Sequence, residues 1–352
     1  MYFNSKQPIC KTLPSCNTST GNSDNGPQKA YIVGNAESEK CSGTDCPVSK
    51  VVIWDLDGCM IDVGESVMGA VDAASHNNSI YIADDGGFYW IVGADNKIEK
   101  HQLNYPSGYK NSEVTGISVN SIGDVYVAGM VVKNGKEYNA YWKNGELVKA
   151  FRENGTTSSE KHVAADSKGN VFIPGWRYVS HTTQYSALWI NGTRKNLSTV
   201  DDGEATDAVI GSETASGSNV WISGAQGKSQ QGKTLAAYWR RKPNGTTSQT
   251  NVTKVGTYNL GVSEFNSSIA RSIFVKGSTV YMAGVVNVIN AGDVPVYWKG
   301  KVQHELPVEF NLNTCDYCKA DPTDISLLDD SVLVVGDYYD ANDKVDSYYT
   351  HG

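Results

Sequence analysis

The sequence predicts an all-β fold, a seven-bladed β-propeller with four antiparallel strands in each blade. A strand phrase that ends on glycine, typified by residues 125–129, recurs along the chain, and a Tyr-Trp phrase such as residues 140–145 follows each copy. Seven such units arise at a period of about 45 to 60 residues, which is typical of propellers. No segment keeps an apolar period near 3.6 over three turns, so helix is not expected.

One unit shows how the strands are predicted. In residues 113–148, the alternating stretch 117–119 is the first strand, and the turn 120–124 leads into a β-branched and aromatic second strand at 125–128. Residues 140–142 form the third strand, and the turn 143–145, which requires positive φ, leads into the fourth. The glycine-ending phrase recurs at residues 31–34, 80–83, 171–175, 220–224, 280–284 and 332–336.

Six of the eight tryptophans share one position in these units, namely Trp54, Trp90, Trp142, Trp189, Trp239 and Trp298. Trp221 takes the second-strand position that Tyr126 and Phe172 occupy in other units. A position common to every blade favours packing between blades over contact with a ligand. We therefore expect these indoles to be buried.

Residues 162–175 resemble a repeat of bacterial β-propeller proteins, in which a short apolar strand is followed by Asp-x-x-Gly-Asn and an aromatic strand that closes on glycine. The Tyr-Trp-Lys-Asn-Gly half is similar to tandem units of secreted or surface proteins of bacteria whose function is uncharacterised. The resemblance covers nearly the whole chain. It implies a propeller but no catalytic residue, because the matching positions are strand and turn positions.

We expect residues 1–352 to form a single propeller domain whose ends meet. The predicted blades cover residues 14–62, 63–104, 105–151, 152–199, 200–258, 259–308 and 309–352. The last unit stops after its third strand, and residues 2–14 resemble residues 297–307. Residues 1–13, with a strand at about 7–13, are therefore predicted to complete the last blade and close the ring.

Composition points to an extracytoplasmic β protein. Charged residues make up only 19% of the chain, with 20 Tyr and 35 Gly, and the formal net charge is -8. This charge disfavours nucleic acid or an anionic membrane surface as partner, and no apolar run predicts membrane insertion.

Cysteines lie in close pairs in predicted loops, which favours disulfides and a secreted or cell-surface location: Cys10 and Cys16, Cys41 and Cys46, Cys315 and Cys318, with Cys59 left over. The alternative, a zinc site at Cys315-x-x-Cys318, lacks a second ligand pair nearby.

Two further patterns concern modification and cofactors. Eight sequons begin at Asn17, Asn77, Asn154, Asn191, Asn196, Asn244, Asn251 and Asn266. They are candidate glycosylation sites if the source organism glycosylates, and the favoured alternative is that these residues belong to the polar turns of a bacterial protein. No cofactor is expected; Asp55, Asp57 and Asp62 share only the beginning of a calcium-loop pattern and form a weak calcium candidate.

Two groups of residues are candidates for ligand binding. The first is a predicted loop rich in aromatic residues, with Trp176, Arg177, Tyr178, His181 and Tyr185. Such a loop is suited to recognition, and packing on a neighbouring blade is the alternative interpretation.

The second group lies at the predicted mouth of the central channel. Alignment of the inner strands places Gly69, Gly116, His162, Asp207, Arg271 and Asp324 at equivalent positions. These side chains could bind a small polar ligand or act as catalytic acid and base. A solvated channel with ion pairs between neighbouring blades is the favoured interpretation.

Loop lengths predict which face carries the function. Connections between second and third strands, and from one blade to the next, are long and variable, and all emerge on one face. We therefore expect a non-catalytic secreted or cell-surface propeller that binds a protein or glycan through this face, as part of an extracellular assembly. The alternative is an extracellular enzyme that acts on a polysaccharide or other polar substrate with acid and base groups at the channel mouth.

Overall fold

The protein is seen here in a computed structural model that describes residues 31–37, 49–55, 60–152, 162–178, 183–198, 203–227, 234–251, 265–289, 292–306, 319–328, 330–339 and 345–351. Every regular element in these ranges is a β-strand, and none of them is a helix. The all-β prediction is therefore confirmed for the described part of the chain. All strand pairs within the sheets are antiparallel and join neighbours in sequence.

The described strands form seven sheets, numbered here in chain order. The first three are β1 (Tyr31–Glu37), β2 (Ser49–Asp55) and β3 (Met60–Ser66); β4 (Ala70–His76), β5 (Ser79–Asp84), β6 (Phe88–Val92) and β7 (Ile98–Gln102); and β8 (Tyr109–Val119), β9 (Val125–Lys133), β10 (Lys136–Lys143) and β11 (Glu146–Phe151). The fourth and fifth are β12 (Ala164–Ala165), β13 (Val171–Tyr178), β14 (Gln184–Ile190) and β15 (Thr193–Asn196); and β16 (Glu204–Thr214), β17 (Gly217–Gln226), β18 (Leu235–Arg241) and β19 (Thr247–Asn251). The last two are β20 (Phe265–Lys276), β21 (Thr279–Val288), β22 (Gly292–Lys299) and β23 (Val302–Glu305); and β24 (Lys319–Leu328), β25 (Ser331–Tyr339) and β26 (Val345–His351).

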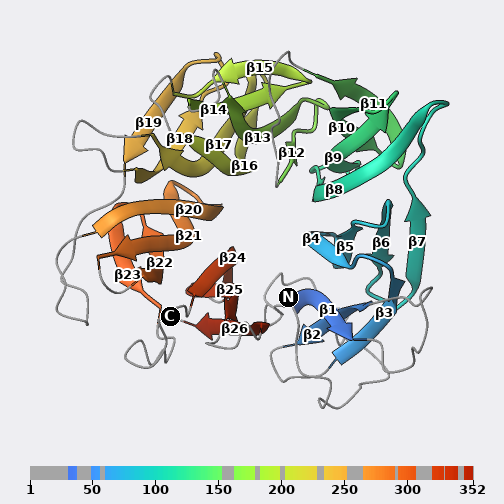
Figure 1. The fold of residues 1–352 in the computed structure, drawn as a ribbon, viewed down its shortest axis with the longest axis horizontal. Coiled ribbons are helices and arrows are strands. Elements are labelled where there is room, and N and C mark those ends of the chain that lie inside the picture. Colours follow the sequence, from blue (N-terminus) through green and yellow to red (C-terminus); the bar gives the residue numbers. More distant parts are fainter. Residues whose placement is uncertain are drawn as a thin grey trace.

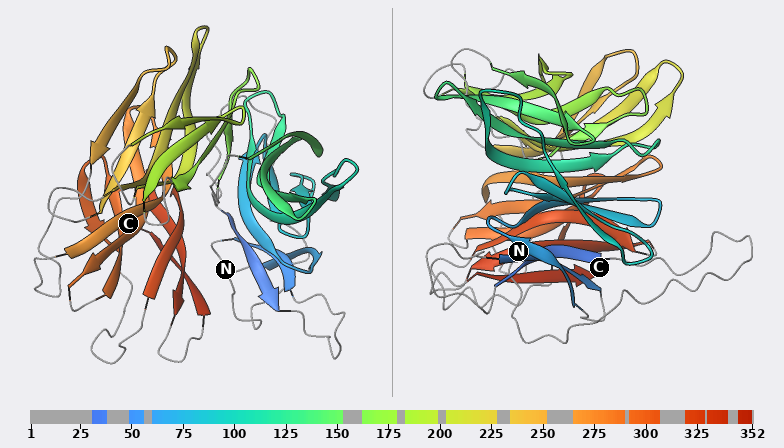
Figure 2. Two further views of the ribbon diagram at one scale, coloured as in Figure 1. Left: turned by 45° about the horizontal axis from the view of Figure 1, so that its top comes forward. Right: turned by 90° about the vertical axis from the view of Figure 1, so that its right-hand side faces the viewer.

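The sheets are arranged around a common axis in a propeller-like manner (Figure 1). In the second to seventh sheets the strands β4, β8, β12, β16, β20 and β24 lie nearest the axis, and each of these six sheets runs outward from its inner strand in chain order (Figures 1 and 2). The first sheet lies beside the seventh, and Val335 of β25 packs against a buried cluster of the first sheet that includes Ile32 and Val52. The predicted closing strand at residues 7–13 lies outside the described residues.

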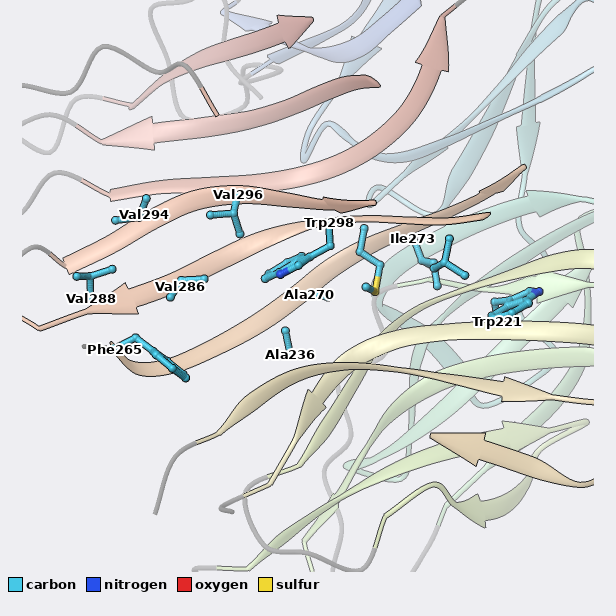
Figure 3. Packing of buried hydrophobic residues seen from close by; sticks show 12 residues of the cluster. Trp221, Ala236, Phe265, Ala270, Ile273, Val286, Val288, Val294, Val296 and Trp298 are labelled. Atoms are coloured by element: carbon cyan, nitrogen blue, oxygen red, sulfur yellow. The ribbon is translucent and has the colours of Figure 1, made fainter. Parts of the chain in front are cut away.

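The shared tryptophans form the contacts between sheets. Trp54, Trp90, Trp142, Trp189, Trp239 and Trp298 are all buried, which confirms the prediction made from their repeat position. In one cluster Trp298 of the sixth sheet and Trp221 of the fifth lie with Ile273 and Val296 among apolar side chains of both sheets (Figure 3). Burial of such large side chains supplies most of the free energy that holds neighbouring sheets together.

The repeated polar phrases form turns. Asp166 Oδ1 accepts the backbone N–H groups of Lys168 at 3.1 Å and Asn170 at 2.8 Å, which explains the Asp-x-x-Gly-Asn pattern. Asn144, with φ 50°, accepts the N–H of Val125 at 2.8 Å through its side chain. Turn residues of this kind tolerate the left-handed conformation that a tight hairpin needs.

Steric contact explains why the repeated second-strand phrase ends on glycine. A Cβ atom at Gly284 would lie 2.0 Å from the carbonyl oxygen of Ile269 on the neighbouring strand. The second sheet has Asp84 at this position instead, and its buried carboxylate accepts hydrogen bonds from Ser66, Gly86 and Trp90. The glycine-ending phrase therefore marks close contact between the two innermost strands of a sheet.

The two faces of the molecule carry different connections. In each antiparallel sheet, hairpins between first and second strands and between third and fourth strands share one face, called here the turn face. The opposite face, called the loop face, carries the second-to-third connections and those between sheets. In the first sheet β1 carries the glycine-ending phrase and so takes the second-strand position. Strand ends on the loop face are far apart in sequence, as for Glu37 and Ser49 or Asn251 and Phe265, whereas turn-face hairpins such as 77–78 and 215–216 are tight.

Candidate functional site: an axial cluster of charged groups

A β-bulge in most inner strands determines which side chains point toward the axis. The register shifts between Ala70 and Asp72, Val114 and Gly116, Ala205 and Asp207, Ala270 and Ser272, and Pro322 and Asp324. Each bulge adds one residue to the strand and redirects the residue that follows. In the fourth sheet, His162 precedes β12 and lies at the same level. The equivalent residues are therefore Asp72, Gly116, His162, Asp207, Ser272 and Asp324.

This register corrects the alignment made from the sequence. Gly69 and Arg271 are not equivalent to Asp207; Asp72 and Ser272 take those places. Arg271 is the extra residue of its bulge, and its Nε lies 3.2 Å from Asp321 Oδ1 of β24. The same bulge precedes Gly116, Asp207 and Asp324, which were aligned correctly, so the bulge is not the cause. The hairpin between the two inner strands occupies residues 120–124 in the third sheet but only 77–78 and 277–278 in the second and sixth, and this difference in turn length displaced the alignment.

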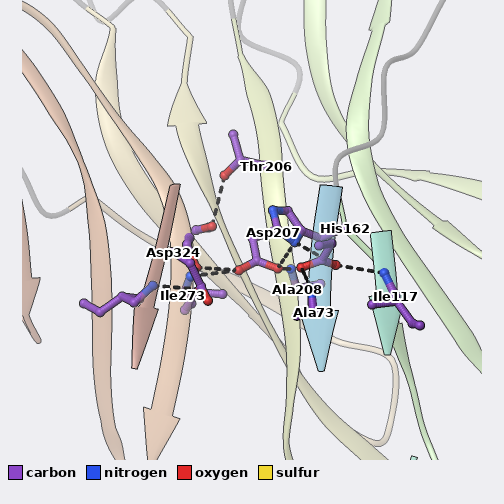
Figure 4. Close-up of polar contacts among 12 residues, drawn as sticks. Ala73, Ile117, His162, Thr206, Asp207, Ala208, Ile273 and Asp324 are labelled. Atoms are coloured by element: carbon purple, nitrogen blue, oxygen red, sulfur yellow. Dashed lines mark hydrogen bonds and ion pairs between the residues drawn. The ribbon is translucent and has the colours of Figure 1, made fainter. Parts of the chain in front are cut away.

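His162 lies between two carboxylates from different sheets. Its Nδ1 is 3.5 Å from Asp72 Oδ2 and 3.7 Å from Asp207 Oδ1 (Figure 4). Burial opposes the charged imidazolium, but the carboxylates of Asp207 and Asp72 outweigh it and raise the pKa of His162 to about 10. The histidine is therefore a cation at neutral pH, and it links the second, fourth and fifth sheets.

Ser272 and Asp324 extend this cluster toward the seventh sheet. The Ser272 hydroxyl lies 3.0 Å from Asp207 Oδ2 and 2.8 Å from Asp324 Oδ1. Burial and the neighbouring Asp207 carboxylate raise the pKa of Asp324 to about 6, and burial raises the pKa of Asp207 as well. Asp324 keeps the larger contact with solvent, whereas Asp207 is buried.

The carboxylates also bind the backbone of the next sheet. Asp72 Oδ2 accepts the N–H of Ile117 at 2.8 Å, and Asp207 Oδ2 accepts the N–H of Ile273 at 2.9 Å. Each therefore joins its own sheet to the following one, at the same position in both. The favoured sequence interpretation was a solvated channel with ion pairs between neighbouring blades. The pairs His162–Asp207 and Arg271–Asp321 join neighbouring sheets, whereas His162–Asp72 joins the fourth sheet to the second. Asp72 and Ser272 were missed, and only the register of the inner strands places them at this level.

The aromatic group around Trp176 is a hairpin and not the loop that was predicted. Trp176, Arg177 and Tyr178 belong to β13, and Tyr185 belongs to β14, directly opposite Arg177. Because successive strand residues point to opposite faces, Trp176 and Tyr178 share one face while Arg177 and Tyr185 share the other. The alternation of these side chains prevents them from forming one patch. His181 lies outside the described residues.

The remaining candidates have limited structural support. Asp62 of β3 pairs with Lys50, Asp55 ends β2, and Asp57 lies outside the described residues. Within the described ranges no group of three His, Cys, Asp or Glu side chains is arranged to hold a metal ion. All seven cysteines fall outside these ranges, as do Asn17 and Asn154.

The described sequons occupy exposed positions. Asn77, Asn191, Asn196, Asn244, Asn251 and Asn266 are all exposed. The Asn191 side chain accepts the N–H of Val171 at 2.8 Å, and Asn244 accepts that of Thr246 at 3.0 Å. Both side chains therefore have structural roles in turns, and glycosylation of the sequons stays a prediction.

No protein-family model matches the sequence, and no curated protein does. Among solved structures, a catalytically inactive variant of virginiamycin B lyase from Staphylococcus aureus, determined with quinupristin, is 11% identical, with a TM-score of 0.49 over 92% of this chain and 99% of that chain. TolB from Acinetobacter baumannii is 14% identical, with a TM-score of 0.43 over 79% of this chain and 64% of that chain. The WD40 β-propeller domain of Doa1 is 9% identical, with a TM-score of 0.36 over 80% and 92%. At these values the matches carry no argument about function.

The described residues contain no helix that is long and apolar enough to cross a membrane.

Proposed function

We propose that this chain is a non-catalytic binding propeller that recognises a protein or glycan through its loop face. The proposal includes a ring of seven blades closed by residues 7–13, and a location outside the cytoplasm. The observation that carries it is the contrast between the two faces. The strand ends on one face of the sheets are joined by long stretches of sequence that vary in length, and long loops on a fixed scaffold are the usual place for recognition.

Two features of the described residues support recognition over catalysis. The axial charges are engaged with one another and with backbone N–H groups, so their first role is to join sheets. The loop face also exposes large apolar side chains, with Val67 and Met68 between the first and second sheets and Tyr178 at the end of β13. Exposed apolar and aromatic side chains are favourable contacts for a partner.

The test compares the two faces on the full-length chain. Binding is measured on a glycan array and on a displayed peptide library. Loop-face variants Met68→Ser and Tyr178→Ala are matched with turn-face variants Ile122→Ser and Val302→Ser, which also remove exposed apolar side chains. We expect the loop-face variants to lose at least about tenfold in affinity for any hit, since an interface residue of this kind contributes about 1.4 kcal/mol or more. The proposal would be contradicted if loop-face and turn-face variants lost affinity equally. It would also be contradicted if neither the glycan array nor the peptide library gave a binding partner.

A second candidate function is acid–base catalysis, and one observation favours it. Asp324 combines contact with solvent and a pKa raised to about 6, which suits a general acid near neutral pH. A hydrolysis screen over polysaccharides and other polar substrates tests this function. Turnover that Asp324→Asn abolishes, while folding is retained, would replace the binding proposal by the catalytic one.

A further inference from the structure

The Ser272 hydroxyl lies between two carboxyl groups and can satisfy only one of them as a donor. It is 3.0 Å from Asp207 Oδ2 and 2.8 Å from Asp324 Oδ1. A serine hydroxyl carries a single hydrogen and accepts through its lone pairs. If both carboxyl groups were ionised, one oxygen would face a lone pair of Ser272 at hydrogen-bond distance. Both contacts are favourable only when one carboxyl group carries a proton and donates it to the hydroxyl.

The other contacts of the two carboxyl groups indicate which one holds this proton. Asp207 accepts the N–H of Ala208 at 2.6 Å and that of Ile273 at 2.9 Å, and it faces the His162 cation at 3.7 Å. These donors stabilise its ionised form. Asp324 accepts a single backbone N–H, that of Ile325 at 2.7 Å, through Oδ1, which is also the oxygen that contacts Ser272 and must therefore carry the proton while it accepts this N–H through a lone pair. No cation pairs with Asp324 among the described residues. The proton therefore resides on Asp324, which also has the better access to water.

We infer that Asp324, Ser272 and Asp207 form a proton-dependent latch that joins the fifth, sixth and seventh sheets at the axis. In the closed latch, the Asp324 carboxyl donates to Ser272 Oγ, and Ser272 donates to Asp207. When Asp324 releases its proton to solvent, two carboxylates compete for one hydroxyl hydrogen and repel each other. The seventh sheet is then held less tightly to its neighbours.

The surrounding charges do not remove this repulsion. His162 faces Asp72 of β4 and Asp207 of β16, so its charge is shared between those carboxylates. Arg271 of β20 pairs with Asp321 of β24. Since the pKa of Asp324 is raised to about 6, chiefly by burial and then by Asp207, the latch closes in mildly acidic solution and opens toward neutral pH. The seventh sheet lies beside the first sheet, and the two pack together through Val335. The latch therefore acts close to the contact between the first and last sheets.

Hydrogen exchange of the full-length chain tests the latch. Exchange of the β24 amides is compared at about pH 5 and about pH 7.5 after correction for the intrinsic pH dependence. In the wild-type protein we expect exchange to be about tenfold faster at the higher pH, equivalent to a pKa difference of about one unit. Asp324→Asn supplies an amide donor to Ser272 at every pH, so its β24 amides should stay protected with less than about a twofold change.

The matched control is Asp330→Asn, on the exposed turn between β24 and β25, where the carboxylate pairs with Lys276. This variant should keep the wild-type pH response, because Asp330 has no contact with the latch. The same pH response in Asp324→Asn and in the wild type would overturn the inference, as would a wild type without any response. Should Asp324→Asn fail to fold, a carboxyl ¹³C titration of the wild type decides: Asp324 titrating near pH 6 and above Asp207 supports the latch, and the reverse order refutes it.

Discussion

Replacement of His162 by glutamine should weaken the fold strongly, because it removes the cation between two carboxylates. At an effective dielectric constant of about 20, contacts of 3.5 Å and 3.7 Å between unit charges each contribute about 4 to 5 kcal/mol. Removing the imidazolium from water offsets several kcal/mol of this attraction. We expect His162→Gln to reduce the free energy of unfolding by about 3 kcal/mol, measured by urea denaturation at neutral pH.

A double-variant cycle separates charge from packing. If the loss comes from carboxylates left without a cation, Asp207→Asn in the His162→Gln background should restore about half of it. The matched control is His101→Gln, since His101 lies 3.4 Å from Glu99 at a more exposed position and should change stability by less than about 1 kcal/mol. A cost for His162→Gln no greater than that for His101→Gln would refute the reasoning.

The pH dependence provides a separate check. The pKa of His162 is raised from an ordinary value of 6.5 to about 10 in the folded state. Its contribution to stability is therefore complete below about pH 6.5 and is lost as the pH rises through about 10. The stability difference between wild type and His162→Gln should shrink over that interval. A difference that stays constant up to about pH 10 would mean that His162 does not act as a cation.

Three further predictions concern the sheets. Trp298→Ala should cost about 3 to 5 kcal/mol in urea denaturation because the indole is fully buried between the fifth and sixth sheets, and a cost below about 1 kcal/mol would contradict that packing. Gly284→Ala should cost about 2 kcal/mol or more, since its Cβ would lie 2.0 Å from the Ile269 carbonyl oxygen; an unchanged denaturation midpoint would contradict this contact. Deletion of residues 1–13 should lower the melting temperature sharply, and an unchanged melting curve would count against the closing strand.

The recurring phrases were sufficient to predict the strands and the buried tryptophans. A period-2 alternation bounded by glycine and asparagine turns is a local signal, and the structure has strands at the positions that it indicates, as in β9, β10 and β17. The side chains of Trp142 and Trp239 are buried, as expected for a position that recurs from unit to unit. Each repeated unit contacts the next unit in the same way, so a residue at a repeated position packs against the adjacent sheet. Both conclusions depend on residues close together in the chain.

The site could be predicted only in part. His162, Asp207 and Asp324 were identified from the sequence, whereas Asp72 and Ser272 were assigned only through the register of the inner strands. The aromatic hairpin at Trp176 was mistaken for a loop because the second strand was expected to end at Gly175, whereas β13 continues to Tyr178. Neither a bulge nor the orientation of a hairpin is encoded in composition.

The sequence by itself therefore determined the strand units, their order and the residues that bury them, because hydrophobic periodicity and turn chemistry act over a few neighbouring residues. Only the tertiary structure decided that Asp72 and Ser272 join His162, Asp207 and Asp324 at the axis, and which of these groups contact one another. These groups come from five sheets that are distant in sequence. Their protonation depends on the electrostatic interactions that arise once the sheets have packed together.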